Sequence, residues 1–347
     1  MKVSKTKCNK LSFITLTVSG LLIICILAIT AWVLVIPKFW QKEISIREIY
    51  IPTGTTFSQI VDILDENELI HDKNTFWLAA KILRVAGKLQ AGKYAINTGL
   101  SHYSVLQILT QGKVTAEWVT IPEGTDRFEI ASILSKKVNI DSAKFIQLTE
   151  NINNIAKIDT NAPSLEGYLY PETYRLFWGI DEQKIIDIML KQFNNHFNDS
   201  LKIRLTELGM STHEILTIAS IIEGEASVDS ERVLISAIYH NRLRKNMLLQ
   251  ACPTVQYVLP GPPRRLLNKD LEIDSPFNTY IYAGLPPGPV NNPGIKSIKA
   301  ALYPSDVDYL YLVAKGDGSH VFSRTMQAHI RAKREFNKLR NDLYNND

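Results

Sequence analysis

The chain has 347 residues, an ordinary globular composition and three cysteines, which is enough for one large or two modest domains with full cores. Its formal net charge is +4, but Lys2, Lys5, Lys7 and Lys10 account for this excess and the rest of the chain is close to neutral. A nearly neutral body lacks the basic surface that nucleic acid requires, so we exclude nucleic acid as a partner.

The first expected element is a membrane-spanning helix. Residues 11–36 contain no charged side chain, and about 20 apolar residues suffice to cross a bilayer core. Lysines precede the segment, and Trp32, Phe39 and Trp40 stand where interfacial aromatic residues are found. A cleaved signal peptide is the alternative, but the apolar stretch is too long and lacks an obvious small-residue cleavage site. The positive-inside rule predicts a cytoplasmic tail (1–10), a single-pass anchor in the cell (inner) membrane (11–36) and an extracytoplasmic remainder.

Cysteine usage agrees with this topology. Cys8 falls in the predicted tail and Cys25 in the predicted anchor, which leaves Cys252 alone in the exported part. No disulfide can form within that part, so its stability must come from core packing. An isolated thiol without a supporting motif is expected to be incidental rather than nucleophilic.

An internal repeat follows the anchor at an offset of 70 residues. Residues 51–64 (IPTGTTFSQIVDIL) align with residues 121–134 (IPEGTDRFEIASIL), and half of the aligned positions are identical. Each copy is typical of a strand that ends at Pro-x-Gly-Thr, with Thr55 or Thr125 as the N-cap of an amphipathic helix. We expect two related α/β units over 45–112 and 115–178, the second of which could be absorbed into a larger domain.

Beyond residue 180 the sequence no longer shows the repeat and instead predicts several helices followed by long loops. A helix is expected over 185–197, and Ser211-Thr-His-Glu214 is a capping box that opens another. Asp229 or Ser230 is expected to cap a helix that ends near Lys245. The proline- and glycine-rich residues 251–294 predict long, rigid loops, which often line a site. Residues 309–314 and 321–322 predict a hairpin, and a final helix is expected from Met326.

The capped helix ends in two carboxylates, in the sequence IASIIEGEAS. Ile215, Ile218, Ala219 and Ile222 follow helical spacing, which predicts that this helix is buried. Glu223 comes next, where burial and the helix dipole both favour a protonated carboxyl, as a general acid requires. Glycoside cleavage most often uses such an acid. We expect Gly224 to end the helix, so that Glu225 points to solvent or caps the next segment.

The residues alone leave a second interpretation of Glu223 open, which is a structural glutamate paired to an arginine such as Arg232 or Arg242. Other chemistries lack support. His213-Glu214 has no second histidine four residues after the first, and no Cys/His cluster exists, so we expect no metal. No nucleophile elbow or P-loop spacing occurs, and we expect no cofactor.

These motifs resemble those of the endolytic murein transglycosylases of the YceG-like (MltG) family. The resemblance covers essentially the whole chain and rests on several segments, which are residues 165–174 (LEGYLYPETY), 218–225 (IASIIEGE), 241–243 with 249–257, 278–280 with 284–294, and 309–322. It implies an α+β protein with an N-terminal transmembrane helix, a small LysM-like α/β subdomain (45–112) and a larger mixed α/β catalytic domain (115–347). One departure is Cys252, which stands where relatives commonly carry an aspartate.

The resemblance also implies a reaction. A lytic transglycosylase cleaves the β-1,4 bond between N-acetylmuramic acid and N-acetylglucosamine without water and leaves a 1,6-anhydro end. The family's catalytic glutamate is assigned to Glu223. One carboxyl suffices because the muramyl 6-hydroxyl is a tethered nucleophile, whereas an inverting hydrolase needs a second carboxylate. A hydrolytic muramidase and a non-enzymatic, LysM-type peptidoglycan-binding module remain the alternatives.

The other motif residues are expected to hold glycan. Asn241, Arg242, Gln250 and Thr254 offer hydrogen bonds, and Tyr257 and Tyr280 offer stacking faces. His320 could orient the acid or a sugar. Glu166 and Glu172 are expected to be structural. The resemblance further suggests that the protein works on peptidoglycan glycan strands beside the synthases that polymerise them.

Overall fold

The structure, a computed structural model, describes residues 4–35, 44–52, 54–112, 115–158 and 162–344. The chain divides into two compact units, Met1–Glu117 with Phe177–Ile180 and Trp118–Leu176 with Asp181–Asp347. Helices and small two-stranded sheets make up both units, which confirms the α+β class. Helix α1 (Ser4–Val35) includes most of the predicted anchor, and in the described part of the chain no helix reaches the length and hydropathy that a membrane span requires.

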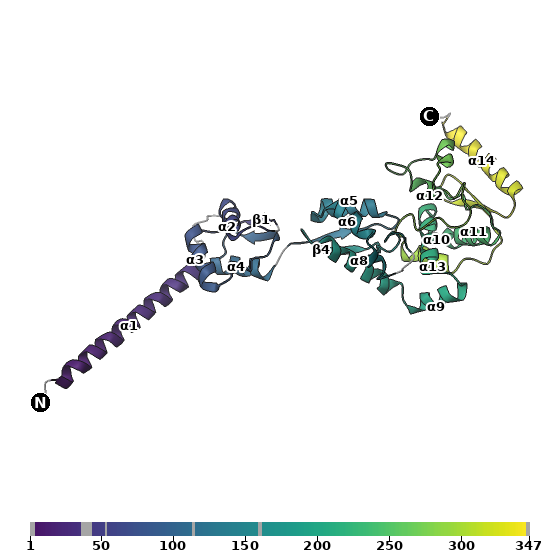
Figure 1. Ribbon diagram of the computed structural model, residues 1–347. Helices are drawn as coiled ribbons and strands as arrows, with labels where there is room; N and C mark the ends of the chain where they lie inside the picture. Colours follow the sequence, from purple (N-terminus) through teal and green to yellow (C-terminus); the bar gives the residue numbers. More distant parts are fainter. Residues whose placement is uncertain (1–3, 36–43, 53, 113–114, 159–161, 345–347) are drawn as a thin grey trace. The chain divides into compact units, whose positions relative to one another are not determined.

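The first unit is built on a β-α-α-β order. Strands β1 (Ile46–Ile51) and β2 (Gly92–Asn97) pair antiparallel, with Ile46 opposite Asn97 and Ile51 opposite Gly92. Helices α2 (Phe57–Glu66) and α3 (Lys73–Leu83) connect them, and α4 (His102–Gln111) follows (Figure 1). The core contains Leu64, Phe76, Tyr94, Ile96 and Leu106, together with Val33 from α1.

A similar order of elements, with one short helix added, comes next in the chain. Strands β3 (Ala116–Thr120) and β4 (Thr173–Phe177) form a sheet, and α5 (Arg127–Val138), α6 (Ser142–Thr149) and the short α7 (Ile152–Ile155) lie between them in sequence. Both aligned segments therefore run from a strand through a turn into a helix.

The repeated Pro-x-Gly-Thr turn corrects the predicted helix caps. The Thr55 hydroxyl donates to the Pro52 carbonyl at 2.7 Å, and the Thr125 hydroxyl donates to the Pro122 carbonyl at 2.6 Å. Both threonines therefore close the turn rather than cap the helix. The N-caps are the next residues, Thr56 and Asp126.

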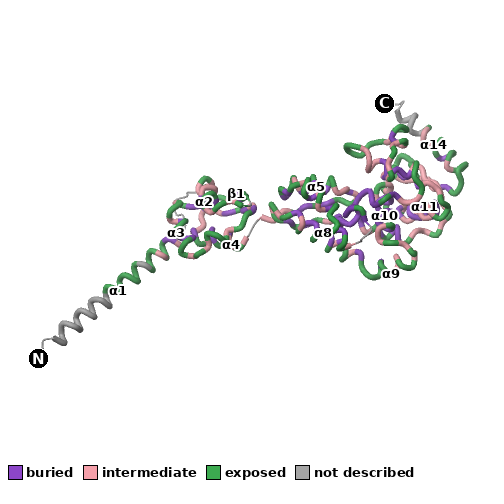
Figure 2. Tube along the Cα trace, viewed as in Figure 1, coloured by how far each residue is buried: buried purple, intermediate pink, exposed green. Residues whose placement is uncertain are grey.

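The remainder of the second unit surrounds one buried helix, α10 (Thr212–Glu225). The helices α8 (Glu182–His196) and α9 (Asp199–Leu208) precede it. The predicted capping box is confirmed, because Ser211 and Glu214 exchange hydrogen bonds with each other's backbone amides. All residues from Ile215 to Ile222 are buried, and α10 packs against α11 (Arg232–Arg244), α12 (Cys252–Gln256) and α13 (Ile295–Leu302) (Figure 2).

Two predicted boundaries near α10 differ from the structure. Gly224 does not end the helix, since the Ala226 amide still donates to the Ile222 carbonyl at 2.9 Å. A glycine is required there for space, because a Cβ would lie 2.7 Å from the Pro253 ring. No side chain caps α11. Asp229 begins the 3-10 turn η1 (Asp229–Glu231), and its carboxylate pairs with Arg232 at 3.1 Å and with Lys296.

The C-terminal part contains the predicted loops, hairpin and helix. Within the loops lie α12 and a 3-10 turn, η2 (Asn268–Glu272). Strands β5 (Tyr311–Ala314) and β6 (His320–Ser323) pair antiparallel with Ala314 opposite His320, and α14 (Met326–Tyr344) follows. The predicted hairpin and final helix are therefore confirmed, with the first strand starting two residues later than expected.

Candidate active site

The two glutamates at the end of α10 have different surroundings. They lie two positions apart in the helix, which places them about 200° apart around its axis. Because the helix continues through Gly224 to Glu225, both side chains are fixed on its last turn. They therefore face different neighbours and have to be considered separately.

Glu223 is held by a buried ion pair. Its Oε1 lies 3.0 Å from Arg232 Nη1, and its Oε2 accepts a hydrogen bond from the Gly294 amide at 3.0 Å. The carboxylate is 7% exposed and the Arg232 side chain 10%. Both oxygens of the Glu223 carboxyl group therefore have a hydrogen-bonding partner, and these contacts correspond to the structural interpretation of Glu223 that the sequence left open.

Glu225 was expected to point to solvent or to cap a following segment, and in the structure it contacts the first residue of α12, Cys252. Its side chain lines a cavity of about 570 Å³, and its Oε1 accepts a hydrogen bond from the Cys252 amide at 3.0 Å. Burial raises the pKa of the Glu225 carboxyl, and the Cys252 amide opposes part of that rise. A raised carboxyl pKa is the property that a general acid requires near neutral pH.

The cavity at Glu225 brings four of the predicted site residues together, and these are Arg242, Gln250, Tyr280 and His320. They come from α11, from the loop before α12, from the loop after η2 and from β6, so distant parts of the sequence converge on one carboxyl. The wall contains both aromatic side chains and hydrogen-bonding groups. Such a wall suits a sugar, which offers apolar faces and hydroxyl edges.

Two of these side chains are fixed by their own partners. Arg242 donates from Nε to the Leu310 carbonyl at 2.7 Å and from Nη1 to the Leu249 carbonyl at 2.7 Å. His320 Nδ1 lies 2.7 Å from Glu231 Oε2. Both side chains therefore keep their position without a ligand, which is preorganisation of the kind that catalytic sites need.

Three predicted residues lie outside this cavity. Asn241 is buried and donates from Nδ2 to the Val307 and Tyr309 carbonyls at 2.8 and 2.9 Å. Thr254 is fully buried and donates to the Ala251 carbonyl at 2.8 Å. Tyr257 packs on Phe277 with ring centroids 5.0 Å apart and faces a different cavity. Asn241 and Thr254 therefore stabilise the loops that form the cavity wall.

Sequence reasoning missed Tyr239 and Tyr311, which also line the cavity. Tyr239 precedes Arg242 by three residues, and this spacing places both on one face of a helix, so the signal was available. The Arg242 Cζ lies 5.4 Å from the centre of the Tyr311 ring. This contact joins α11 to β5, which are far apart in the sequence, so no local sequence pattern could have predicted it.

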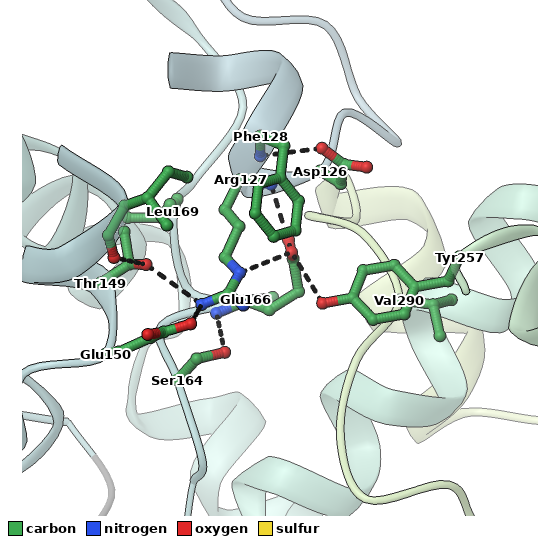
Figure 3. A network of polar contacts seen from close by, with 12 residues as sticks. Asp126, Arg127, Phe128, Thr149, Glu150, Ser164, Glu166, Leu169, Tyr257 and Val290 are labelled. Atoms are coloured by element: carbon green, nitrogen blue, oxygen red, sulfur yellow. Dashed lines mark hydrogen bonds and ion pairs between the residues drawn. The ribbon is translucent and has the colours of Figure 1, made fainter. Parts of the chain in front are cut away.

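Glu166, predicted to be structural, forms the centre of a buried network in the second unit (Figure 3). Its Oε1 accepts from Asn292 Nδ2 at 2.8 Å, and its Oε2 accepts from the Arg127 amide at 3.2 Å and from the Tyr257 hydroxyl at 3.4 Å. Asn292 Oδ1 in turn accepts from the Gly167 and Leu169 amides, both at 2.9 Å. The network therefore ties the start of α5 to the loop that leads into α13. Burial raises the pKa of Glu166 to about 8.

A carboxyl with a burial-raised pKa, facing a cavity walled by aromatic and hydrogen-bonding side chains, is an arrangement that acid catalysis of glycosidic bond cleavage can use. Residues 49–335 match the model of the YceG-like family, and the chain belongs to that family. The resemblance predicted from the motifs is thereby confirmed.

Known relatives agree. The endolytic murein transglycosylase of Bacillus subtilis (strain 168) is 36% identical over 311 residues, which cover 85% of this chain and 86% of that protein. The protein of the same name from Streptococcus pneumoniae serotype 2 (strain D39 / NCTC 7466) is 26% identical over 313 residues, 81% of this chain and 56% of its own length. The crystal structure of a yceG-like protein from Listeria monocytogenes matches with a TM-score of 0.58 and 33% identity, covering 84% of this chain and 99% of that one.

Proposed function

We propose that this protein is an endolytic transglycosylase of peptidoglycan, and that Glu225 rather than Glu223 is its general acid. The observation that carries the proposal is the position of Glu225, a carboxyl with a burial-raised pKa that faces the cavity holding Arg242, Gln250, Tyr280 and His320. The names of the Bacillus and Streptococcus relatives support the reaction. Glu223 is the buried ion-pair partner of Arg232 and would have a structural role.

The reaction needs two proton transfers by one carboxyl. Protonated Glu225 donates its proton to the glycosidic oxygen as the bond from that oxygen to C1 of N-acetylmuramic acid breaks. The Glu225 carboxylate then accepts the proton of the muramyl 6-hydroxyl while the oxygen of that hydroxyl bonds to C1. The products are a strand with a 1,6-anhydro end and a strand with a free hydroxyl, and Glu225 is protonated again.

The composition of the cavity favours this route over hydrolysis. An inverting hydrolase places a second carboxylate about 6.5–9.5 Å away to activate water. Among the described residues that line the cavity, Glu225 is the one carboxylic acid. Tyr280 and Tyr311 would stack on sugar faces, and Arg242 and Gln250 would bind N-acetyl or hydroxyl groups.

The location of the protein is part of the proposal. The uncharged residues 11–36 would anchor it in the cell membrane, with residues 1–10 in the cytoplasm and residues 40–347 outside. The first unit, with its β-α-α-β order, would be a LysM-like subdomain that contacts glycan strands beside the synthases. A membrane-impermeant maleimide applied to spheroplasts should label Cys252 and spare Cys8. Equal labelling of both would refute this topology.

Digestion of purified peptidoglycan in H₂¹⁸O tests the reaction. We expect anhydro-muramyl products that lack ¹⁸O, because no water enters. Reducing ends that carry ¹⁸O would identify a muramidase instead. Strand binding without any cleavage would identify a non-enzymatic module.

A further inference from the structure

Helix α14 contributes side chains to the cavity at Glu225 to which the proposed reaction gives no role. They are Met326, His329, Ile330 and Lys333. The helix packs against β5 and β6. On β5, the Tyr311 ring stacks on His329 with ring centroids 5.3 Å apart, and its centre lies 5.4 Å from Arg242 Cζ. Tyr311 therefore connects Arg242, on α11, to the side of the cavity that α14 forms.

Arg242 is a buried cation that lacks a counter-ion. The residue is 7% exposed, and its Nε and Nη1 donate to neutral acceptors, which are the carbonyls of Leu248, Leu249 and Leu310 and the side chain of Gln250. Among the described residues no carboxylate forms an ion pair with Arg242, and its Nη2 makes no hydrogen bond. Buried charges in proteins are ordinarily paired, so this unpaired cation favours an anionic group of a ligand.

The charges on the cavity wall are predominantly positive. Arg242 and Lys333 are its permanent cations, and Glu225 is the one carboxylic acid among the described residues that line it. Burial raises the pKa of Glu225, so in the protonated form that the reaction needs it opposes neither cation. Burial lowers the pKa of His329, and the charges of Lys333 and Arg242 lower it further, so both charges act on the same part of the cavity.

Lys333 is the accessible member of this pair. Its side chain is exposed on α14, and among the described residues it has no carboxylate partner. A lysine ammonium is a compact point charge on a flexible stem, which lets it follow a carboxylate whose position varies with its carrier. The buried charge of Arg242 adds to the attraction, because it acts from a medium of low dielectric constant.

We propose that Lys333 and Arg242 form an anion subsite for a carboxylate carried on the lactyl arm of muramic acid in the strand bound at Glu225. The proposal rests on the proposed function. The N-acetylated sugar rings carry no charge, so this arm is where such a strand offers anions. The carboxylate is either that of the free lactyl group or one of the stem peptide attached to it. Lys333 is then a specificity-determining residue that selects strands with a charged arm.

A matched pair of lysine substitutions tests this subsite. Lys333→Gln removes the charge at the cavity, whereas Lys338→Gln removes the same charge from an exposed position of α14 that does not line the cavity. Each substitution is made in the full chain with Glu225→Gln and purified in detergent. Calorimetry at low salt measures the binding of stem-bearing and of peptide-free glycan strands of equal length, each as the free acid and as the methyl ester.

With Glu225→Gln alone, we expect the free acid of at least one strand to bind about tenfold more tightly than its ester. Lys333→Gln should bring this ratio close to one, and Lys338→Gln should leave it unchanged. A preference confined to peptide-free strands would assign the lactyl carboxylate, and one confined to stem-bearing strands would assign the peptide. Equal binding of acid and ester in both strands would overturn the proposal, as would an unchanged ratio in Lys333→Gln.

The release of anhydro products by the unsubstituted protein tests the proposed function separately. If products are released while acid and ester bind equally, this inference alone fails. If none is released, the proposed reaction fails, and a preference for the acid that Lys333→Gln abolishes would still establish the subsite.

Discussion

Glu166 offers a prediction that connects the buried network to stability. Because its pKa is raised from 4.5 to about 8 by burial, the folded state keeps a proton that the unfolded chain releases above its ordinary pKa. The contribution of Glu166 to stability is therefore fully present below pH 4.5 and is lost as the pH rises through 8. At about 1.4 kcal/mol per pH unit, the loss over this window reaches up to about 5 kcal/mol.

Glu166→Gln should remove this dependence on pH. Asn292, Arg127 and Tyr257 all donate hydrogen bonds to Glu166. The NH₂ group of a glutamine at this position would face one of these donors without being able to accept from it. The substitution should therefore lower the free energy of unfolding by about 1–3 kcal/mol at low pH. From pH 5 to pH 8 the stability of Glu166→Gln should therefore fall much less than that of the unsubstituted protein.

Native-state hydrogen exchange of the Arg127 and Leu169 amides, corrected for intrinsic rates, measures the local opening free energy at each pH. Glu207→Gln is the control, because this side chain is 57% exposed, pairs with an arginine rather than a histidine, and should leave the slope unchanged. Parallel slopes in the unsubstituted protein and in Glu166→Gln would refute the reasoning.

Three further predictions concern the end of α10. Gly224→Ala places a Cβ 2.7 Å from the Pro253 ring and should cost about 1–3 kcal/mol in urea unfolding; a neutral effect would contradict the close approach. Arg232→Met strands the buried Glu223 carboxylate and should cost about 3–5 kcal/mol, whereas a loss below about 1 kcal/mol would show that the pair contributes little. The rate of anhydro product release should fall as pH rises through the burial-raised pKa of Glu225, because the acid must carry its proton; a rate that rises over this range would contradict that role.

Much of the architecture could be predicted from local patterns. Helical spacing identified α10 and its burial, the capping box marked its start, and proline and glycine marked the loops of residues 251–294. The repeated Pro-x-Gly-Thr turn was also visible. The predicted caps were one residue early, because a threonine hydroxyl can close a turn as readily as it caps a helix.

The choice between Glu223 and Glu225 depended on tertiary contacts. From sequence, Gly224 resembled a helix end, because glycine is common there. In the structure Gly224 instead allows α10 to approach Pro253 closely, and the helix continues to Glu225. Arg232 was named as a partner for Glu223, but its distance to the carboxylate is fixed by the packing of α10 with α11. Arg242, Gln250, Tyr280 and His320, all predicted for one site, share one cavity, and Glu225 rather than Glu223 lines it.

One measurement tests the central claim most directly, which is the release of anhydro-muramyl products from purified peptidoglycan by Glu225→Gln and by Glu223→Gln. Circular dichroism and thermal unfolding of each variant provide the control for folding. The account predicts that Glu225→Gln is folded and releases no anhydro product, while Glu223→Gln is less stable but still cleaves at temperatures where it is folded. Retained cleavage in Glu225→Gln, with loss of cleavage in a folded Glu223→Gln, would contradict it.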